Sequence, residues 1–218
     1  MYEREVKCMN NRLNIRVYGI DGAVERFTLE DAELVNRTLA ELHPTRLYLN
    51  DQITISDDYF QKTFAASRIT RIDFVTEQLS VWDFPFSFGA LSELTEPEFG
   101  DGIRLSEEAN RKKARSGMAV YLDLQMLDGL RSLLWMQIVD GLQSARLKKI
   151  YSLFKEPRLI FGLRSGGVGV LNLANLVHFA VVPEPPGSVP ADAARELDDR
   201  LIHLRSETRT ASLQTKQL

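Results

Sequence analysis

The stretch from Leu13 to Gly22, LNIRVYGIDG, decides how this chain is interpreted, because its pattern returns at Val120 to Gly129 as VYLDLQMLDG. In both stretches apolar and polar residues alternate, and an Asp-Gly pair follows. Alternation with a period of two is typical of a half-buried strand, and Asp-Gly beside such a strand favours a tight hairpin turn. Each stretch therefore predicts the first strand and the turn of a β-hairpin.

The two regions stay in step across about 60 residues, at an offset of about 107 that slips once by one residue. The further matches pair Leu47, Tyr48, Ile53 and Ile55 with Leu153, Phe154, Leu159 and Phe161, and Phe64, Ile69, Ile72 and Phe74 with Leu171, Leu176, Phe179 and Val181. Few matches are identities, so chance alternation in two α+β segments is the alternative. The shared order of hairpin, helix, hairpin and strand favours an internal duplication.

The fold class that this pattern predicts is α+β, a tandem duplication of a ββαβββ unit with pseudo-two-fold symmetry. The first copy has predicted strands at 12–19, 23–28, 53–55, 59–64 and 68–76, and a helix that opens at Thr28 and Asp31 and stops before Pro44. The second copy has predicted strands at 119–127 and 130–139, a helix from Asp140 to Pro157, and the strands RLIFGL, VGVLNL and LVHFAVV. The apolar runs RLIFGL and LVHFAVV predict burial on both faces. We expect the two sheets to pack together or to extend one another.

The domain organisation follows from this pattern. We expect a first unit at 1–76, a structured connector at 77–117, a second unit at 118–183, and a Pro-rich spacer, short helix and disordered tail at 184–218.

An aromatic strap lies in the connector. Its large side chains recur at every second position, so in an extended chain they share one face; they are Trp82, Phe84, Phe86 and Phe88. Pro85 lacks an amide hydrogen, which excludes a central strand. Two interpretations stay open: the strap covers the open face of the first sheet, or it is a docking segment for a partner.

A basic cluster follows an acidic, turn-rich segment at 92–102. A short helix is predicted from Ser106 to just before Gly117, and it carries Arg111, Lys112, Lys113 and Arg115. With Lys148 and Lys149, these residues are the alternative binding site, for nucleic acid or an anionic surface. Glu107 and Glu108 stand four residues before Arg111 and Lys112, so ion pairs on a solvated helix explain the pattern without a ligand.

The tail carries a thin apolar stripe. After the spacer PEPPGSVP, the segment ADAARELDDRLIHLRSE predicts a helix whose buried face is Leu197, Leu201 and Leu204. Such a helix clamps onto the body of the protein or onto another subunit.

Composition narrows the class of protein. The chain has 218 residues, 44% of them hydrophobic and 26% charged, with a net charge of −3, which disfavours a generally cationic nucleic-acid binder. The lone Cys8 excludes an intramolecular disulfide and a zinc site made of cysteines. The sequence contains no apolar run of about 18 residues, so no transmembrane helix is predicted. The first residues lack the apolar core of a secretory signal. The expected location is cytoplasmic.

No residue pattern predicts catalysis, a metal or a cofactor. The three histidines, His43, His178 and His203, show no metal-binding spacing, and Gly166-Gly167 reads as a hairpin turn because a strand follows it. An enzyme with a site between the two units is the third hypothesis, and His178 and Cys8 are its only candidate residues.

The function predicted first is a non-catalytic protein-interaction or assembly protein. Its partner is another protein or a second copy of the chain, since self-association covers open sheet edges. The candidate contacts are Trp82, Phe84, Phe86 and Phe88 on the strap and Leu197, Leu201 and Leu204 on the tail.

Overall fold

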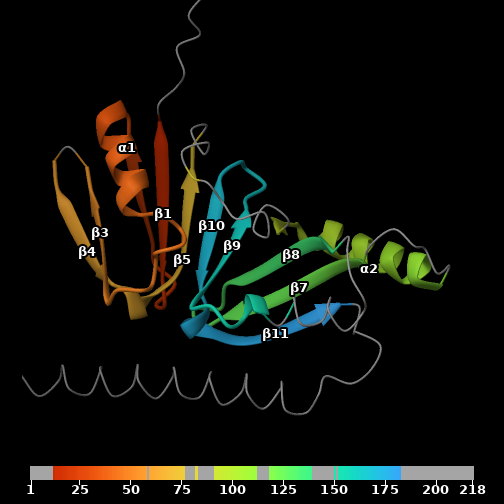
Figure 1. Cartoon of the computed structure of the whole chain (residues 1–218). Helices are drawn as coiled ribbons and strands as arrows, with labels where there is room; N and C mark the ends of the chain where they lie inside the picture. The colour runs from red at the N-terminus through yellow and green to blue at the C-terminus, as the bar shows by residue number, and fades with distance from the viewer. Residues whose placement is uncertain are drawn as a thin grey trace, which may run out of the picture.

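The computed structural model of the chain describes residues 12–57, 59–76, 82, 91–111, 118–138, 150 and 152–182, and all statements below concern these residues. The protein is of mixed α+β class, mostly strands, with two longer helices among the described residues (Figure 1). The predicted class is therefore confirmed.

The first half of the chain contains five strands and one α-helix. They are β1 (Leu13–Gly19), β2 (Val24–Leu29), α1 (Ala32–Glu41), β3 (Gln52–Ser56), β4 (Gln61–Ala65), the short 3-10 helix η1 (Ala66–Arg68) and β5 (Ile69–Val75). Asp31 is the N-cap of α1, because its Oδ1 accepts a hydrogen bond of 2.8 Å from the amide of Leu34.

The second half also contains five strands. They are β7 (Met118–Met126), β8 (Arg131–Ile138), β9 (Arg158–Gly162), β10 (Val168–Asn172), the 3-10 helix η3 (Leu173–Asn175) and β11 (Leu176–Val182). Between the halves lie β6 (Ser92–Glu93) and α2 (Glu96–Arg111). Most of the helix predicted between β8 and β9 lies outside the described residues.

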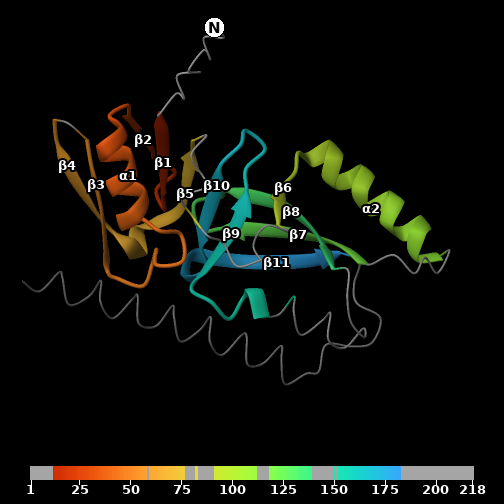
Figure 2. The same cartoon turned by 45° about the horizontal axis from the view of Figure 1, so that its top comes forward.

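One nine-stranded sheet joins the two halves, in the order β11-β7-β8-β6-β9-β10-β5-β1-β2. The junction is the antiparallel pair of β10 with β5. Strands β3 and β4 form a separate two-stranded sheet beside α1, at the opposite end of the molecule from α2 (Figure 2). The expectation that the sheets extend one another agrees with this order.

Strand registers correspond between the halves at an offset of 107. Ile15 lies opposite Phe74 and Phe27, and Leu122 lies opposite Val181 and Leu134. The register shift at Tyr18/Gly19 against β5 also has a counterpart, in β11 between Leu176 and His178.

The two hairpin turns share one geometry. Asp21 Oδ1 and Asp128 Oδ1 each accept a hydrogen bond from the amide two residues on, at 3.1 and 2.9 Å. Gly22 and Gly129 have φ values of 79° and 85°, a left-handed conformation that favours glycine. Both Asp-Gly predictions are confirmed.

The loop of the second hairpin accounts for the one-residue slip. Ser56 pairs with Gln61, so residues 57–60 form the loop between β3 and β4. Gly162 pairs with Val168, so residues 163–167 form the longer loop between β9 and β10. Corresponding residues are therefore 106 apart before this loop, as Ser56 and Gly162 are, and 107 apart after it, as Gln61 and Val168 are.

Each half builds a separate apolar core. The first core gathers Leu13, Ile15, Phe27, Leu39, Ile55 and Phe74, and the second gathers Val120, Leu122, Leu134, Ile150, Phe161 and Leu176. A third cluster, of Phe99, Tyr121 and Leu133, places α2 against the opposite face of β7 and β8. Strand β10 lies between the cores, since Val168 and Val170 contact the first and Leu171 the second.

Helix α2 begins at Glu96, so the predicted acidic turn and short helix from Ser106 need correction. The amide of Thr95 donates to Glu98 Oε2 at 2.8 Å, and the amide of Glu98 donates to Thr95 Oγ1 at 3.4 Å. This reciprocal pair is a capping box. Thr95-Glu96-Pro97-Glu98 carries its sequence pattern, and its acidic first turn also suits the helix dipole.

The predicted burial on both faces is confirmed for β9 and is wrong for β11, and β10 is buried on both faces as well. Leu159, Ile160 and Phe161 are all buried, and so is every residue of β10. In β11, Leu176 is buried whereas Val177 and His178 are exposed. The difference arises because β9 and β10 lie between two cores, whereas β11 ends the sheet order.

Candidate functional site

Trp82 packs inside the first core. Its side chain is 4% exposed, its Nε1 donates to the carbonyl of Leu39 at 2.7 Å, and its ring meets that of Phe74 edge to face at 5.1 Å. This packing agrees with the interpretation that the strap covers the first sheet. Phe84, Phe86 and Phe88 lie outside the described residues, so the docking role of the strap stays a prediction.

Most of the other predicted contact residues lie outside the described residues, so their roles stay predictions. Arg111 is the last residue of α2, and Lys112, Lys113, Arg115, Lys148 and Lys149 lie outside the described residues. Leu197, Leu201 and Leu204 on the tail also lie outside them, as does Cys8. His178 is exposed on β11. Within the described ranges, no group of three or more His, Cys, Asp or Glu side chains is arranged to hold a metal ion.

The junction between the halves holds a buried polar network that sequence reasoning missed. Arg71 donates from Nε to Asp73 Oδ1 at 2.5 Å and from Nη2 to Glu93 Oε1 at 2.8 Å. Tyr18 donates its hydroxyl proton to Asp73 Oδ2 at 3.0 Å, and the guanidinium carbon of Arg71 lies 5.0 Å from the ring centroid of Phe161. The alternating pattern of RITRIDFV contains the signal, because Arg71 and Asp73 share one face of a strand.

Burial governs the electrostatics of this network. Desolvation raises the pKa of the Asp73 carboxyl, although Arg71 and the hydroxyl of Tyr18 oppose the rise by favouring the charged form. Arg71 and Asp73 thus hold one another in place, and Glu93 of β6 also binds Arg71. Because the guanidinium and the carboxylate already have partners, the network reads as a structural link between β5, β1 and β6.

The tip of the β3–β4 hairpin presents two aromatic side chains to solvent. Tyr59 is 95% exposed and Phe60 is 52% exposed. Asp57 Oδ1 accepts from both of their amides, at 2.7 and 2.9 Å, and the Phe60 ring lies 6.0 Å from that of Phe27. These hydrogen bonds to the side chain of Asp57 are those of an Asx turn. We call Tyr59 and Phe60 the aromatic tip.

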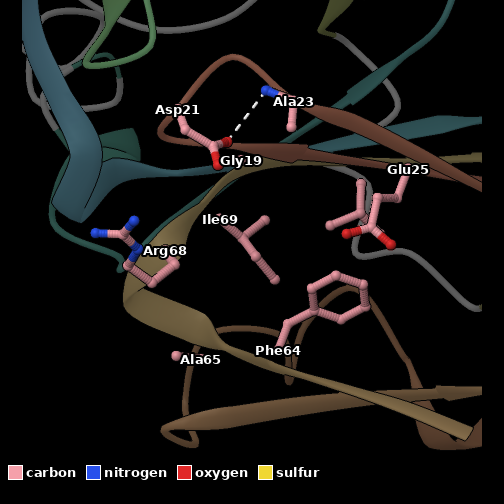
Figure 3. Close-up of a pocket in the computed structure, with 9 residues that line it drawn as sticks. Gly19, Asp21, Ala23, Glu25, Phe64, Ala65, Arg68 and Ile69 are labelled. Carbon is pink, nitrogen blue, oxygen red and sulfur yellow. Dashed lines mark hydrogen bonds between the residues drawn. The ribbon is translucent and has the colours of Figure 1, made fainter.

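A small open cavity lies in the first half, between the β1–β2 hairpin and the chain from β4 to η1. Its volume is about 130 Å³. We call it the hairpin cavity, and its principal lining residues are Gly19, Asp21, Ala23, Glu25, Phe64 and Arg68 (Figure 3). All of its lining belongs to the first half of the chain, so it is not a pocket between the two halves.

The polar groups of the hairpin cavity come from different elements. Figure 3 shows Asp21 at the β1–β2 turn, with Glu25 and Arg68 on opposite sides and Ile69 between them. Glu25 Oε2 is paired with Lys62 Nζ. Among the described residues, the guanidinium of Arg68 has no acceptor. The sequence carries no motif for this arrangement, because the three residues meet only through the packing of the hairpin on η1.

Comparison with known proteins places the chain in no established group. No protein-family model matches it, and neither a curated protein nor a solved structure was found to match. Within the part of the chain that the structure describes, neither helix has the length and apolar character needed to cross a membrane.

Proposed function

We propose that this chain is a non-catalytic interaction protein built from two copies of one ββαβββ unit, and that its first partner is a second copy of itself. The proposed units cover the first and second halves of the chain, related by approximate two-fold symmetry. The matching strand registers, the shared hairpin turn and the corresponding apolar positions of the two cores support the duplication.

The single observation that carries the interaction function is the contrast between the two second hairpins. The β9–β10 hairpin lies in the large sheet, where β10 pairs with β5 and β9 with both β10 and β6. The β3–β4 hairpin pairs only within itself among the described residues. The β9–β10 hairpin thus pairs with strands on both sides. Its counterpart in the first half, β3–β4, has open edges among the described residues and an exposed aromatic tip.

The chemistry of the open hairpin indicates how it would bind. Gln61 and Thr63 occupy the places that Val168 and Val170 take in β10, and they are exposed. The face of the hairpin that carries Gln61 and Thr63 is therefore too polar to pack face to face against the apolar side of another sheet. Binding would use backbone hydrogen bonds along the edge, with Tyr59 as the large anchoring side chain, a residue type enriched at the centres of interfaces.

Light scattering coupled to size exclusion tests the proposal. We expect a mass above that of the monomer at micromolar concentration, and a return to the monomer mass in Tyr59→Ser. Leu105→Ser is the matched control, because Leu105 is an apolar residue 61% exposed on α2, far along the chain from the hairpin. A monomeric wild type overturns self-association, and an oligomer that Tyr59→Ser leaves intact overturns the role of the β3–β4 hairpin in it.

The alternative function, electrostatic binding through the basic cluster, has a separate test. Electrostatic binding through Arg111, Lys112, Lys113 and Arg115 predicts affinity for nucleic acid or anionic vesicles that falls steeply with salt. Reversal of charge at Lys112 and Lys113 should abolish that binding if the basic cluster is responsible.

A further inference from the structure

The junction between the halves has a second, unformed equivalent. Strand β10 pairs with β5 in an antiparallel register that sets Val168 opposite Phe74 and Val170 opposite Ile72. At the offset of 107, β4 corresponds to β10, and β11 corresponds to β5. Among the described residues, however, β4 pairs only with β3, and β11 pairs only with β7. The edges that correspond to the two sides of the junction are therefore both open.

One chain does not bring β4 and β11 together. Strand β11 begins the order of the nine-stranded sheet, whereas β4 belongs to the separate hairpin beside α1. Figure 1 and Figure 2 both show β4 on the outer side of β3, across the molecule from β11. A second copy of the chain is therefore the source of a β11 edge for β4.

The backbone groups of β4 face the open edge at Gln61 and Thr63. The amide of Ala66 donates to the carbonyl of Asp51, the residue opposite it, at 2.7 Å. Because bonded and non-bonded positions alternate along an antiparallel pair, every second residue back from Ala66 turns its backbone groups toward β3. The residues between them, Gln61 and Thr63, direct theirs away from β3. Their counterparts in β10 are the two valines that stand opposite β5.

Strand β11 offers matching positions at Phe179 and Val181. The register of β11 against β7 shifts near its start, at the same point where the register of β5 against β1 shifts. Corresponding residues of β5 and β11 therefore turn their backbone groups the same way. Phe179 and Val181 correspond to Ile72 and Phe74, which stand opposite β10. Both side chains are half-buried against the second core, so they hold the strand in place.

On the basis of the proposed self-association, we infer that β4 of one copy adds to the open edge of β11 of a second copy. The register of the junction, moved by the offset of 107, fixes the pairs. They are Gln61 with Val181, Lys62 with Ala180, and Thr63 with Phe179. Backbone hydrogen bonds along the two edges supply the attraction, as in other cases of strand addition.

The side chains along the two edges are compatible with this pairing. Lys62 is the one charged residue of β4, and its pair with Glu25 holds it toward β2. Ala180, which would lie opposite Lys62, is small and exposed. Extended by one residue, the register sets Phe60 beside Val182. The aromatic tip then reaches the end of β11, which agrees with an anchoring role for the tip.

Disulfide cross-linking between two single-cysteine chains tests the register. Both chains carry Cys8→Ser, which removes the only natural cysteine. One chain carries Lys62→Cys and the other Ala180→Cys, a non-hydrogen-bonded pair whose Cα atoms would be about 4.5 Å apart, within reach of a disulfide. Val177→Cys is the matched control, because Val177 is also exposed on β11 but lies about 10 Å further along the strand. After mixing and mild oxidation, we expect at least ten times more covalent dimer from Lys62→Cys with Ala180→Cys than with Val177→Cys.

A proline variant tests the edge of β4 by a second measurement. Thr63→Pro removes an amide donor that faces away from β3, a place where proline is tolerated in an edge strand. It should return the oligomer to the monomer mass in light scattering and retain a cooperative thermal transition. Thr63→Val keeps the amide donor and should leave the oligomer intact. An oligomer that persists in Thr63→Pro overturns the role of the β4 edge.

The outcomes separate this pairing from self-association as such. A wild type that is oligomeric but gives no cross-link between Lys62→Cys and Ala180→Cys overturns the pairing of β4 with β11 and leaves self-association standing. Equal yields with Ala180→Cys and Val177→Cys overturn the register. A monomeric wild type overturns the proposed function and this pairing together.

Discussion

Arg71 and Asp73 form an ion pair within β5, with Nε 2.5 Å from Oδ1, although the two residues are only 6% and 1% exposed. They stand two residues apart in an extended strand, so their side chains leave the same face. That face looks toward β6 and Phe161, away from the first core. The pair therefore lies where the two halves of the chain meet.

Removal of one partner from this ion pair should be costly. Asp73→Ala leaves the buried guanidinium of Arg71 with Glu93 as its remaining acid, so we expect a loss of about 3 kcal/mol in the free energy of unfolding. Urea denaturation followed by circular dichroism measures this change. Asp101→Ala breaks the exposed pair with Arg104 and should leave the midpoint unchanged. Similar losses in the two variants would contradict the buried role of Asp73.

Tyr48 should make the fold sensitive to alkali. Its hydroxyl donates to the carbonyl of Val170 at 3.2 Å, and burial raises the pKa of the phenol well above its usual value of 10.0. Because the folded chain holds this proton more tightly than the unfolded chain, the stability contributed by Tyr48 is fully present below pH 10 and is lost as the pH rises further. Unfolding by urea at a series of pH values up to about 11 follows this loss.

Tyr48→Phe separates the hydrogen bond from the titration. The variant should lose about 1 kcal/mol at neutral pH, and its stability should decline less steeply than that of the wild type above pH 10. Tyr59→Phe serves as the control, because Tyr59 is 95% exposed and its replacement should leave the slope unchanged. Parallel curves for wild type and Tyr48→Phe would exclude Tyr48 as the source of the alkaline sensitivity.

Two adjacent glycines should respond very differently to alanine. A Cβ at Gly167, where φ is +112°, would lie 2.1 Å from the carbonyl oxygen of Phe74 in the neighbouring strand. At Gly166, where φ is +79°, it would meet nothing within 4 Å. We expect Gly166→Ala to cost about 1 kcal/mol from backbone strain alone, and Gly167→Ala to cost about 3 kcal/mol or more, since β10 must move away from β5. Thermal unfolding compares them, and equal costs would show that β10 tolerates the displacement.

Asn172 should stabilise the junction through backbone groups of the first half. Its side chain is 3% exposed, and Nδ2 donates to the carbonyls of Ala66 and Ile69, each at 3.0 Å. Asn172→Ala removes the donor from these buried acceptors, so we expect a loss of about 2 kcal/mol in unfolding free energy. Asn14→Ala is the comparison, because Asn14 makes an exposed bond to Thr28 and its loss should have little effect. The prediction fails if chemical denaturation ranks the two variants equally.

Much of the local structure could be predicted from residues close together in the chain. The Asp-Gly turns and the alternation in β1 and β7 involve contacts over a few residues, and both appear in the structure. The predicted capping box of Thr28 and Asp31 is wrong, because Thr28 belongs to β2 and Asp31 is itself the N-cap of α1. The capping box from Thr95 to Glu98 was equally local, and it went unrecognised because the surrounding acidic residues and glycines suggested a turn. Local patterns specify local structure because the groups that satisfy one another are neighbours in sequence.

Candidate sites were far less accessible to the same reasoning. The hairpin cavity brings Asp21 and Glu25 to Arg68 from elements some forty residues apart, and nothing in the sequence marks that meeting. Trp82 alternates with three other aromatic residues, a pattern that fits a covering strap and a docking segment equally well, and only its burial beside Phe74 distinguishes its own place. A periodic pattern indicates which residues share a face, but it does not say what that face meets.

What the sequence determined by itself was the α+β class, the hairpins with their turns, and the correspondence between two stretches about 107 residues apart. Tertiary structure alone decided that β10 pairs with β5, that β11 is not buried on both faces despite its apolar sequence, and that Arg71 and Asp73 are enclosed at the junction. The physical reason is distance along the chain. Turns and alternation depend on interactions over a few residues, whereas strand order and burial depend on which distant surfaces exclude water from one another.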